Sequence, residues 1–362
     1  MRRWFFGFDW SLFLPIIILL VFGLLLIHNL TPALFWPQLI NVLIGLAFFF
    51  LFQKIDYRIF ERLDRFIFAS ANLFLVSTFI FGTLTRGVMR WISFGPFTLQ
   101  PSELVKPFLI VFFSVFLARR ELNSRSFFIV SFLFLIPLAL IFFQPDLGSS
   151  FLFLAAWLAI LVAAGVPLKT FLLGFLVFAL LIPLTGKFLF KSYQYSRLIS
   201  FLNPEKDPLG AGYNLIQATV AVGSGQLLGR GWGQGTQSHL RFLPEHQTDF
   251  IFASLAEELG FVGCLVVLLV FAALLWRILR VVKEIEDPLA ILICIGSFGL
   301  LFTQILVNVG MNIGLLPITG ITLPLISYGG SSLVSTMICL GLVASISSLN
   351  KKTKGTIIHS YV

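Results

Sequence analysis

Charged residues are scarce in this sequence, and their scarcity excludes an ordinary soluble protein. Asp, Glu, Lys and Arg make up 11% of the 362 residues, whereas a soluble domain contains about 25%. Hydrophobic residues reach 58%, and the mean hydropathy is +0.99. Apolar runs of about 20 residues, the length that a helix needs to cross a bilayer, recur along the chain. The sequence therefore predicts an all-α polytopic membrane protein, with residues 1–362 forming a single transmembrane domain.

Cysteine is also rare, and its positions exclude a disulfide framework. The three cysteines stand inside apolar runs without metal-ligand spacing, so we expect them to be small core residues. The glycine-rich run 223–235 follows no predicted strand and lacks the Lys-Ser/Thr of a nucleotide-binding loop. This run therefore predicts a mobile loop, and we expect no nucleotide cofactor.

The apolar runs predict about ten transmembrane helices. They lie near 11–29, 36–53, 66–84, 103–118, 127–143, 148–165, 168–185, 249–276, 288–311 and 322–348. The first run is not a cleavable signal peptide, because no small-residue cleavage site follows it and further spans do. An even number of spans puts both termini on one side of the membrane.

Basic residues predict which side this is. Most of the 25 Lys and Arg residues fall on the face that holds both termini, in the short loops near residues 54–65, 119–125 and 277–283 and in the two tails. Because cytoplasmic loops are enriched in such residues, both termini are predicted to be cytoplasmic. The net charge of +9 then reflects membrane orientation, and we expect no nucleic-acid partner.

The opposite face carries one large extracytoplasmic loop, about 186–248, between the seventh and eighth predicted helices. Loops of this length carry function or are disordered, and the composition is not that of a disordered segment. We expect a helix within it near 210–222. A second outer loop spans about 85–102. Any chemistry is therefore expected at the outer face.

Three carboxylates mark the helix after the large loop. Asp249 stands where the polar stretch 245–248 meets the apolar run, and Glu257 and Glu258 lie about two turns further in. Asp249 has an ordinary reading as a helix-terminal carboxylate. Its place at the water-exposed outer end of the predicted helix instead favours a functional site. A helix N-terminus keeps a carboxylate ionised, as a general base or cation ligand requires. For the two glutamates, an ion pair inside the bundle and a role in the site both stay open.

A second group opens the fourth predicted helix. Glu103 and Lys106 are three residues apart, so they share a face and can pair, and Pro107 should bend or open the helix there. Because the pair lies beside such a break at the outer end of the predicted helix, we expect it to line a cavity rather than to lie on the surface. Arg86 and Arg90 stand in the preceding short loop without an acidic neighbour.

Basic side chains recur elsewhere on the outer face. They are Lys187, Lys191, Arg197, Lys206, Arg230 and Arg241. Guanidinium groups suit bidentate recognition of phosphate, so a phosphorylated or pyrophosphorylated outer ligand is plausible.

These groups permit one reaction in particular. A sugar hydroxyl could attack a lipid-linked sugar whose leaving group is pyrophosphate. Pyrophosphate departs without being protonated, so one carboxylate base suffices, in contrast to the paired carboxylates of glycosidases. A divalent cation or arginines would neutralise the leaving charge. The residues alone permit this chemistry without selecting it.

Several motifs together resemble the SEDS family, which comprises RodA, FtsW and SpoVE proteins. The longest is Phe242–Ala253 followed by Glu257-Glu258-Leu259-Gly260. The other matching motifs are Arg90-Trp91-Ile92, Gln100–Glu103 with Lys106, Gln144–Gly148, Asn203-Pro204 with Asp207-Pro208 and Gly212-Tyr213, and Leu323–Ser332. The resemblance covers nearly the whole chain. The stretch Gly235–Ser238 and the short N-terminus are more similar to the RodA branch than to the FtsW branch.

The resemblance implies a peptidoglycan glycosyltransferase at the outer face of the bacterial cytoplasmic membrane. Such an enzyme polymerises lipid II into a growing glycan strand, releases undecaprenyl pyrophosphate and works with a class B penicillin-binding protein. A role in elongation and cell shape is expected rather than one in division. Membrane lipids are further expected partners, and a divalent cation, Mg or Mn, is an expected cofactor.

The same resemblance gives expectations for single residues. It implies that Asp249 is the essential aspartate, that Trp91 is functional and that Glu103 and Lys106 are a functional pair. The residues expected to bind substrate or support the site are Trp91, Arg90, Arg86, Glu103, Lys106, Arg197, Glu245, Asp146, Glu257 and Glu258. Two other classes of function stay open: a lipid II flippase, and a non-catalytic scaffold of the elongation or division complex.

Overall fold

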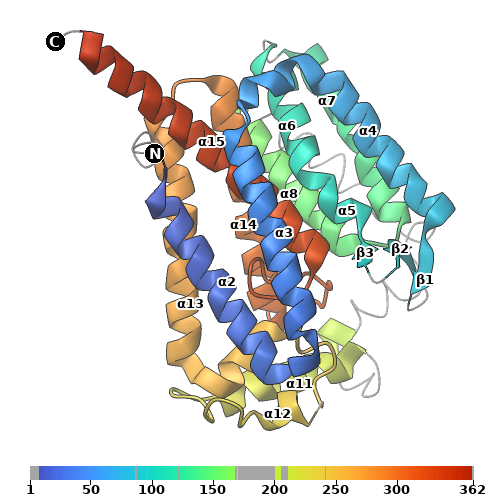
Figure 1. Cartoon of the computed structure of the whole chain (residues 1–362). Helices are drawn as coiled ribbons and strands as arrows, with labels where there is room; N and C mark the ends of the chain where they lie inside the picture. Colours follow the sequence, from blue (N-terminus) through green and yellow to red (C-terminus); the bar gives the residue numbers. More distant parts are fainter. Residues whose placement is uncertain are drawn as a thin grey trace.

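Long apolar helices make up most of the computed structural model (Figure 1). The structure describes residues 8–85, 88–95, 97–120, 123–167, 169, 200–204, 211–240 and 242–360. Its α-helices are α2 (Trp10–Leu30), α3 (Phe35–Lys54), α4 (Phe60–Phe81), α5 (Pro101–Leu104), α6 (Lys106–Ala118), α7 (Ser124–Phe143), α8 (Leu147–Ala163), α11 (Ala211–Ser224), α12 (Thr236–His239), α13 (Ile251–Glu284), α14 (Pro288–Asn312) and α15 (Gly330–Ser360). Two short 3₁₀ helices cover Pro32–Leu34 and Tyr57–Ile59, and the strands are β1 (Thr83–Thr85), β2 (Val88–Phe94) and β3 (Phe97–Leu99).

The membrane character predicted from the sequence is confirmed. Within the described ranges, eight helices are long and apolar enough to cross a membrane, and α8 is a shorter apolar helix. Each predicted span overlaps one of these helices except 168–185, which lies almost wholly outside the described residues, so the total of ten stays a prediction. The last predicted span was wrong at its start: α15 begins at Gly330, and residues 322–329 are not helical.

Short polar side chains start several of these helices. Asn123, Asp146 and Asp287 occupy the N-cap positions of α7, α8 and α14, and each side chain accepts a backbone N–H of the first turn. Pro107 has no N–H to donate to the carbonyl of Glu103, and the helix is interrupted there between α5 and α6. The predicted break at Pro107 is confirmed.

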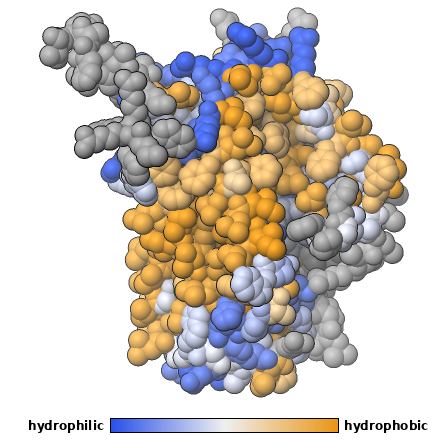
Figure 2. Space-filling model, viewed as in Figure 1, coloured by the Kyte–Doolittle hydropathy of each residue, from blue (hydrophilic) through white to orange (hydrophobic). Residues whose placement is uncertain are grey.

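Helix α15 forms the centre of the bundle. It packs along α3 and contacts α13 and α14, and most of its membrane-crossing window is buried by the other helices (Figure 1). Close approach requires small residues at the contact: a Cβ at Gly341 would lie 2.7 Å from the carbonyl oxygen of Phe49 in α3. On the face shown in Figure 2, an apolar band separates two polar ends, as expected for a chain that spans a bilayer.

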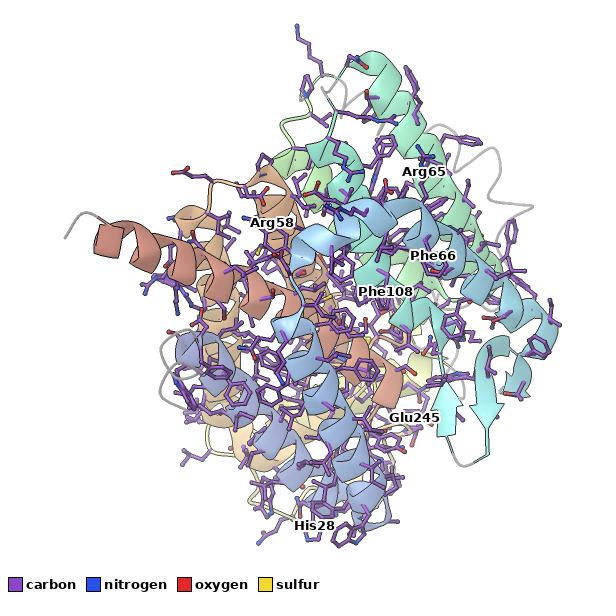
Figure 3. All side chains as sticks on the ribbon, turned by 45° about the horizontal axis from the view of Figure 1, so that its top comes forward. His28, Arg58, Arg65, Phe66, Phe108 and Glu245 are labelled. Carbon is purple, nitrogen blue, oxygen red and sulfur yellow. The ribbon has the colours of Figure 1, made fainter. Side chains whose placement is uncertain are left out.

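The two polar ends differ in charge. At one end, Arg277 of α13 binds Asp9 at 2.6 Å and Lys351 of α15 lies 3.7 Å from the same carboxylate. Both ends of the described chain therefore lie at this basic end, together with Arg58 and Arg65 (Figure 3). The prediction that both termini share one side is confirmed.

The end opposite the basic end carries Glu245 and His28 in Figure 3, and we call it the site end. It includes a small antiparallel sheet, β1-β2-β3, which the sequence analysis treated only as a loop near 85–102. Thr83 pairs with Trp91 between β1 and β2, and Ile92 pairs with Leu99 between β2 and β3. Helix α11 confirms the helix predicted near 210–222.

Candidate active site

The junction 245–250 enters α13 through a run of tight turns. Glu245 has a φ of 54°, and its backbone carbonyl accepts the N–H groups of Thr248 at 3.1 Å and Phe250 at 3.3 Å. The Thr248 hydroxyl also donates to the Glu245 carboxylate at 3.1 Å. These contacts hold Asp249 partly exposed at the site end of the bundle.

Asp249 lies one residue before the N-cap of the helix that follows it. Helix α13 begins at Ile251, its N-cap residue is Phe250, and no side chain at that position provides a capping bond. Asp249 is therefore not the N-cap residue itself, although it remains a carboxylate beside the helix N-terminus. Asp249 lies within one turn of the N-terminus of α13, the end at which a helix dipole stabilises negative charge.

The segment 322–329 packs on the junction and holds its backbone. The hydroxyl of Ser327 donates to the carbonyl of Thr248 at 2.7 Å. The backbone N–H of Tyr328 donates to the carbonyl of Gln247 at 2.9 Å. Backbone groups inside a membrane protein need such partners, because no bulk water is there to bind them. This segment thus fixes the turn from which Asp249 projects.

Two buried asparagines of α14 bind the carbonyl of Asp249 itself. The side-chain amides of Asn308 and Asn312 donate to it at 2.9 Å and 3.0 Å, and both residues have an exposed fraction of 0%. The sequence analysis did not identify them. A signal was present, because two asparagines four residues apart in an apolar run lie on one helix face.

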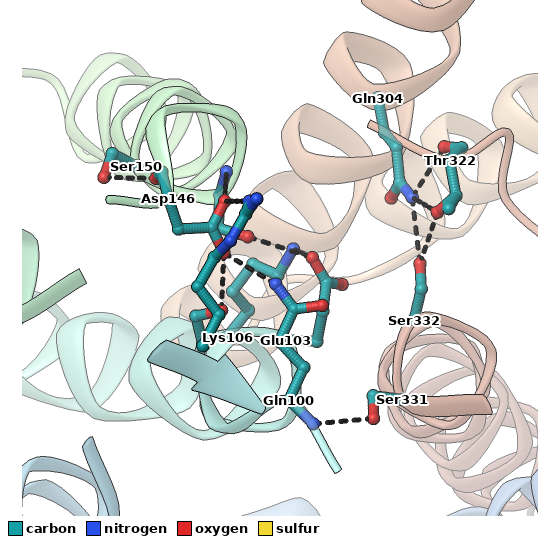
Figure 4. Close-up of polar contacts among 12 residues, drawn as sticks. Gln100, Glu103, Lys106, Asp146, Ser150, Gln304, Thr322, Ser331 and Ser332 are labelled. Carbon is teal, nitrogen blue, oxygen red and sulfur yellow. Dashed lines mark hydrogen bonds and ion pairs between the residues drawn. The ribbon is translucent and has the colours of Figure 1, made fainter. Parts of the chain in front are cut away.

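A second group of polar side chains surrounds the break between α5 and α6 (Figure 4). We call it the second cluster, and its charged members are Glu103, Lys106, Asp146 and Arg90. The ammonium of Lys106, 1% exposed, binds Glu103 at 2.6 Å. The hydroxyl of Ser149 in α8 donates to the same carboxylate oxygen at 3.0 Å. The predicted pairing of Glu103 and Lys106 is confirmed, and the pair is enclosed by the bundle rather than lying on its surface.

Asp146 is the other acidic member of this cluster. Its carboxylate accepts from Gln100 Nε2 and Ser102 Oγ, each at 2.7 Å, and from the N–H of Ser149 at 3.1 Å. The guanidinium of Arg90 lies 3.8 Å away. Burial alone would raise the pKa of Asp146, but the Arg90 charge and these hydrogen bonds outweigh it and hold the pKa below its ordinary value.

One stretch of chain borders both Asp249 and the second cluster. The Ser331 hydroxyl, at the start of α15, accepts the backbone N–H of Gln100 at 3.0 Å (Figure 4). Asn308 donates to the carbonyl of Ile321 at 2.7 Å as well as to Asp249. Residues 321–331 therefore connect the two groups, which come from motifs far apart in sequence.

Glu257 and Glu258 are enclosed by other parts of the chain. Both are 0% exposed. The Glu257 carboxylate accepts the backbone N–H of Ser238, in α12, at 3.1 Å. Glu258 accepts from the amide of Asn29 at 2.6 Å and lies 2.9 Å from the ring nitrogen of His239. These contacts fasten α12 and α2 to α13, so they do not leave the carboxylates open toward a ligand.

Residues 226–231, which we call the strap, pack against a break in α13. Gly260 has a φ of 65° and interrupts the helix, and the N–H of Phe261 donates to the carbonyl of Gln226 at 2.9 Å. A Cβ at Gly229 would lie 2.1 Å from the carbonyl oxygen of Glu258. We predicted a mobile run here; the structure instead gives these glycines the role of permitting close backbone contact.

The remaining predicted site residues are divided by what the structure describes. Trp91 lies in β2 and is partly exposed, and its carbonyl accepts the Thr83 hydroxyl at 3.1 Å. Arg86 and Arg197 lie outside the described residues. Among the outer basic residues named from the sequence, the described part of the chain includes Arg90 and Arg230. The structure thus leaves most of the predicted phosphate-binding charge untested.

The described residues include no cluster of three or more metal-ligating side chains. In that part of the chain, no three or more His, Cys, Asp or Glu side chains gather closely enough to hold a metal ion. Mg²⁺ is often held by only one or two carboxylates, with phosphate oxygens and water completing its shell. The divalent cation implied by the family resemblance therefore stays an expectation.

Sequence comparisons match this chain to one family. Residues 4–352 match the model of the FtsW/RodA/SpoVE family, described as cell cycle proteins. The chain is 35% identical to the peptidoglycan glycosyltransferase MrdB of Escherichia coli K12, with 95% of this chain and 94% of MrdB covered. It is 34% identical to the stage V sporulation protein E of Bacillus subtilis, with 95% and 98% covered.

Solved structures extend the likeness to the fold. A chain of a peptidoglycan synthase complex, solved to describe how polymerization and crosslinking are coordinated, superposes with a TM-score of 0.82 at 29% identity. The match covers 95% of this chain and 98% of that one. The rod shape determining protein RodA of Thermus thermophilus superposes with a TM-score of 0.71 at 26% identity, covering 94% and 96%.

Proposed function

This chain belongs to the FtsW/RodA/SpoVE family of cell cycle proteins, and we propose that it is a peptidoglycan glycosyltransferase that polymerises lipid II for cell elongation and shape. MrdB and the RodA protein of Treponema pallidum, which is 31% identical to this chain, are both called peptidoglycan glycosyltransferases, and each aligns over more than nine tenths of this chain. The single observation that carries the proposed site is the state of Asp249. It is partly exposed at the site end, while its backbone is bound by buried side chains.

In the proposed reaction, Asp249 acts as the general base. A hydroxyl of the acceptor sugar attacks the anomeric carbon of the donor sugar, and its proton passes to the Asp249 carboxylate. The bond between that carbon and the pyrophosphate oxygen breaks, and the lipid pyrophosphate leaves with the bonding electrons. Asp249 then releases the proton to water. The nearby N-terminus of α13 supports this role, because it favours a carboxylate that is ionised before the reaction.

The leaving pyrophosphate needs positive charge close to it. In the second cluster, Lys106 pairs with Glu103 and Arg90 lies beside Asp146, so the four charges cancel. We therefore assign the neutralising charge to the outer basic residues of the loops, with Arg86 and Arg197 as the first candidates, or to a divalent cation carried by the pyrophosphate. The second cluster then supports the site structurally: Asp146 binds the side chain of Gln100, and the backbone N–H of Gln100 donates to Ser331.

Orientation and partners follow from the same proposal. The basic end of the bundle is the cytoplasmic side by the rule that favours Lys and Arg there, so Asp249 faces outward. The likeness to a chain of a peptidoglycan synthase complex supports a class B penicillin-binding protein as partner. Membrane lipids surround the apolar band, and the lipid II tail would enter the site from them.

Polymerisation by purified protein tests the proposal directly. The protein and its partner are supplied with fluorescent lipid II, and glycan polymer is measured for the wild type, for Asp249→Asn and for Asp64→Asn at the basic end. We expect Asp249→Asn to lower the rate by about 10³-fold or more, because a general base contributes roughly 10²–10⁴-fold and the amide cannot accept the proton. Asp64→Asn should change the rate less than about twofold, because Asp64 lies at the opposite end of the bundle, in a partly exposed pair with Arg119.

The outcomes separate the alternative functions. Equal polymer from Asp249→Asn would remove the catalytic role and favour a scaffold. Transfer of lipid II between leaflets without polymer would favour a flippase.

A further inference from the structure

The first turn of α13 contains a side chain from another helix. In an uninterrupted helix, the N–H of Ala253 would donate to the carbonyl of Asp249, four residues earlier. In this structure, that N–H donates to Asn312 Oδ1 at 3.0 Å. The amide nitrogen of the same Asn312 donates to the carbonyl of Asp249 at 3.0 Å. One asparagine of α14 thus lies between the two groups of a single helical hydrogen bond.

Asn308 completes this arrangement. Its amide nitrogen donates to the Asp249 carbonyl at 2.9 Å. A carbonyl oxygen has two lone pairs, and the two asparagines occupy both. The Asp249 carbonyl is therefore fully bound without the helical partner, and regular α13 geometry begins only after it, at Ile251.

We infer that Asn312, supported by Asn308, is a positioning residue that keeps Asp249 out of α13 and so sets the direction of its carboxylate. The inference rests on the proposed role of Asp249 as base. If the helix extended by one more residue pair, Asp249 would adopt helical torsion angles, and its side chain would tilt along the helix surface toward the N-terminus. Neighbouring helical positions differ by about 100° around the axis, so even a small extension would turn the carboxylate away from its present direction.

A purely structural role is the competing explanation for the two asparagines. Side-chain amides satisfy backbone groups in many membrane proteins, and the half-buried Asn350 does so here: it donates to the carbonyl of Glu284, the last residue of α13, at 2.8 Å. Asn350 therefore provides a matched control, because it binds the opposite end of the same helix from α15. If both asparagines serve only to satisfy carbonyls, their removal should have similar consequences.

The experiment compares three variants in the complex with the penicillin-binding protein: Asn312→Leu, Asn312→Asp and Asn350→Leu. Rates are measured against lipid II concentration to separate kcat from KM, and thermal unfolding in detergent reports stability. Asn312→Leu removes both bonds. Asn312→Asp keeps the acceptor for Ala253 and removes the donor to Asp249, so it serves if the leucine variant does not fold.

We expect both Asn312 variants to lower kcat by about 10²-fold, the effect of displacing a reacting group by about 1 Å, with KM within about threefold of wild type. Asn350→Leu removes a bond to a carbonyl at the other end of α13, so it should lower stability while leaving kcat within about threefold of wild type. The inference is overturned if the Asn312 variants keep kcat within threefold of the wild-type value. It is also overturned if Asn350→Leu lowers kcat as much as the Asn312 variants do for the same loss of stability. Failure of the proposed function is distinguishable, because it requires Asp249→Asn itself to remain active.

Discussion

Helix α13 and the turn before it carry acidic residues at two depths, and the chain treats them in opposite ways. Glu257 and Glu258 are completely buried, and their carboxylates accept hydrogen bonds from α12 and α2. Asp249 is partly exposed, and the bonds from Asn308 and Asn312 reach its backbone carbonyl. Glu257 and Glu258 use their side chains to hold neighbouring segments together, whereas the position of Asp249 is fixed by bonds to its backbone carbonyl.

This difference separates a structural carboxylate from a candidate catalytic one. A carboxylate whose oxygens are bound by the surrounding chain contributes to folding, and its removal leaves buried donors without acceptors. Asp249 is held by bonds to its backbone carbonyl, which a substitution of its side chain leaves in place. Variants in the strap, at Glu258 and in the second cluster test how far the distinction extends.

The largest effect is expected from closing the space beside Glu258. In Gly229→Ala, the new Cβ would lie 2.1 Å from the Glu258 carbonyl at a φ of 80°, so the strap must separate from α13. We expect the variant to lose more than about 3 kcal/mol of stability, from overpacking together with left-handed strain. Thermal unfolding in detergent measures this. The control is Gly223→Ala in α11, where a Cβ meets nothing within 4 Å, so a comparable loss there would contradict the explanation.

A smaller effect is expected from neutralising Glu258 itself. Glu258→Gln keeps the shape but places an amide against Asn29 or His239, which lie 2.6 and 2.9 Å from its oxygens. We expect a loss of about 1–3 kcal/mol, the usual result of a mismatched buried polar group. The folded fraction should polymerise lipid II within about threefold of the wild-type rate. A selective loss of rate at unchanged stability would mean that Glu258 belongs to the catalytic group.

The smallest effect concerns the pH dependence of stability in the second cluster. Because the folded-state pKa of Asp146 lies below its ordinary value of 3.8, its contribution to stability is present above about pH 4 and is lost as the pH falls through the folded-state pKa. We therefore expect wild type to unfold at a higher temperature than Asp146→Asn near pH 6, with the gap narrowing toward pH 3. A gap that widens on acidification would contradict the assigned pKa direction.

Local pattern was enough to predict much of this molecule. Long apolar runs identified the helices, and the spacing of Glu103, Lys106 and Pro107 predicted both a pair and a break. The segment 322–329 was assigned to a helix because it is apolar. Its course instead depends on tertiary bonds, such as that from Ser327 to the carbonyl of Thr248, which periodicity does not reveal.

The site was predicted in part for the same reason. A motif resemblance singled out Asp249, but the sequence could not decide whether it is the N-cap residue or lies just outside the helix. The bonds that decide come from Asn308 and Asn312, 59 and 63 residues away in sequence. The roles of Glu257 and Glu258 also depended on α12 and α2, which reach them only in the folded chain.

The most direct test of the central claim measures Asp249→Asn and Glu258→Gln side by side, with unfolding temperature and lipid II polymerisation recorded on the same purified complexes. We expect Asp249→Asn to unfold within a few degrees of wild type, since about 1 kcal/mol moves the transition by only a few degrees in a chain of this size, and to make no detectable polymer. Glu258→Gln should unfold earlier and still polymerise. The reverse pattern, with polymer from Asp249→Asn and none from folded Glu258→Gln, would contradict the assignment of Asp249 as the catalytic carboxylate.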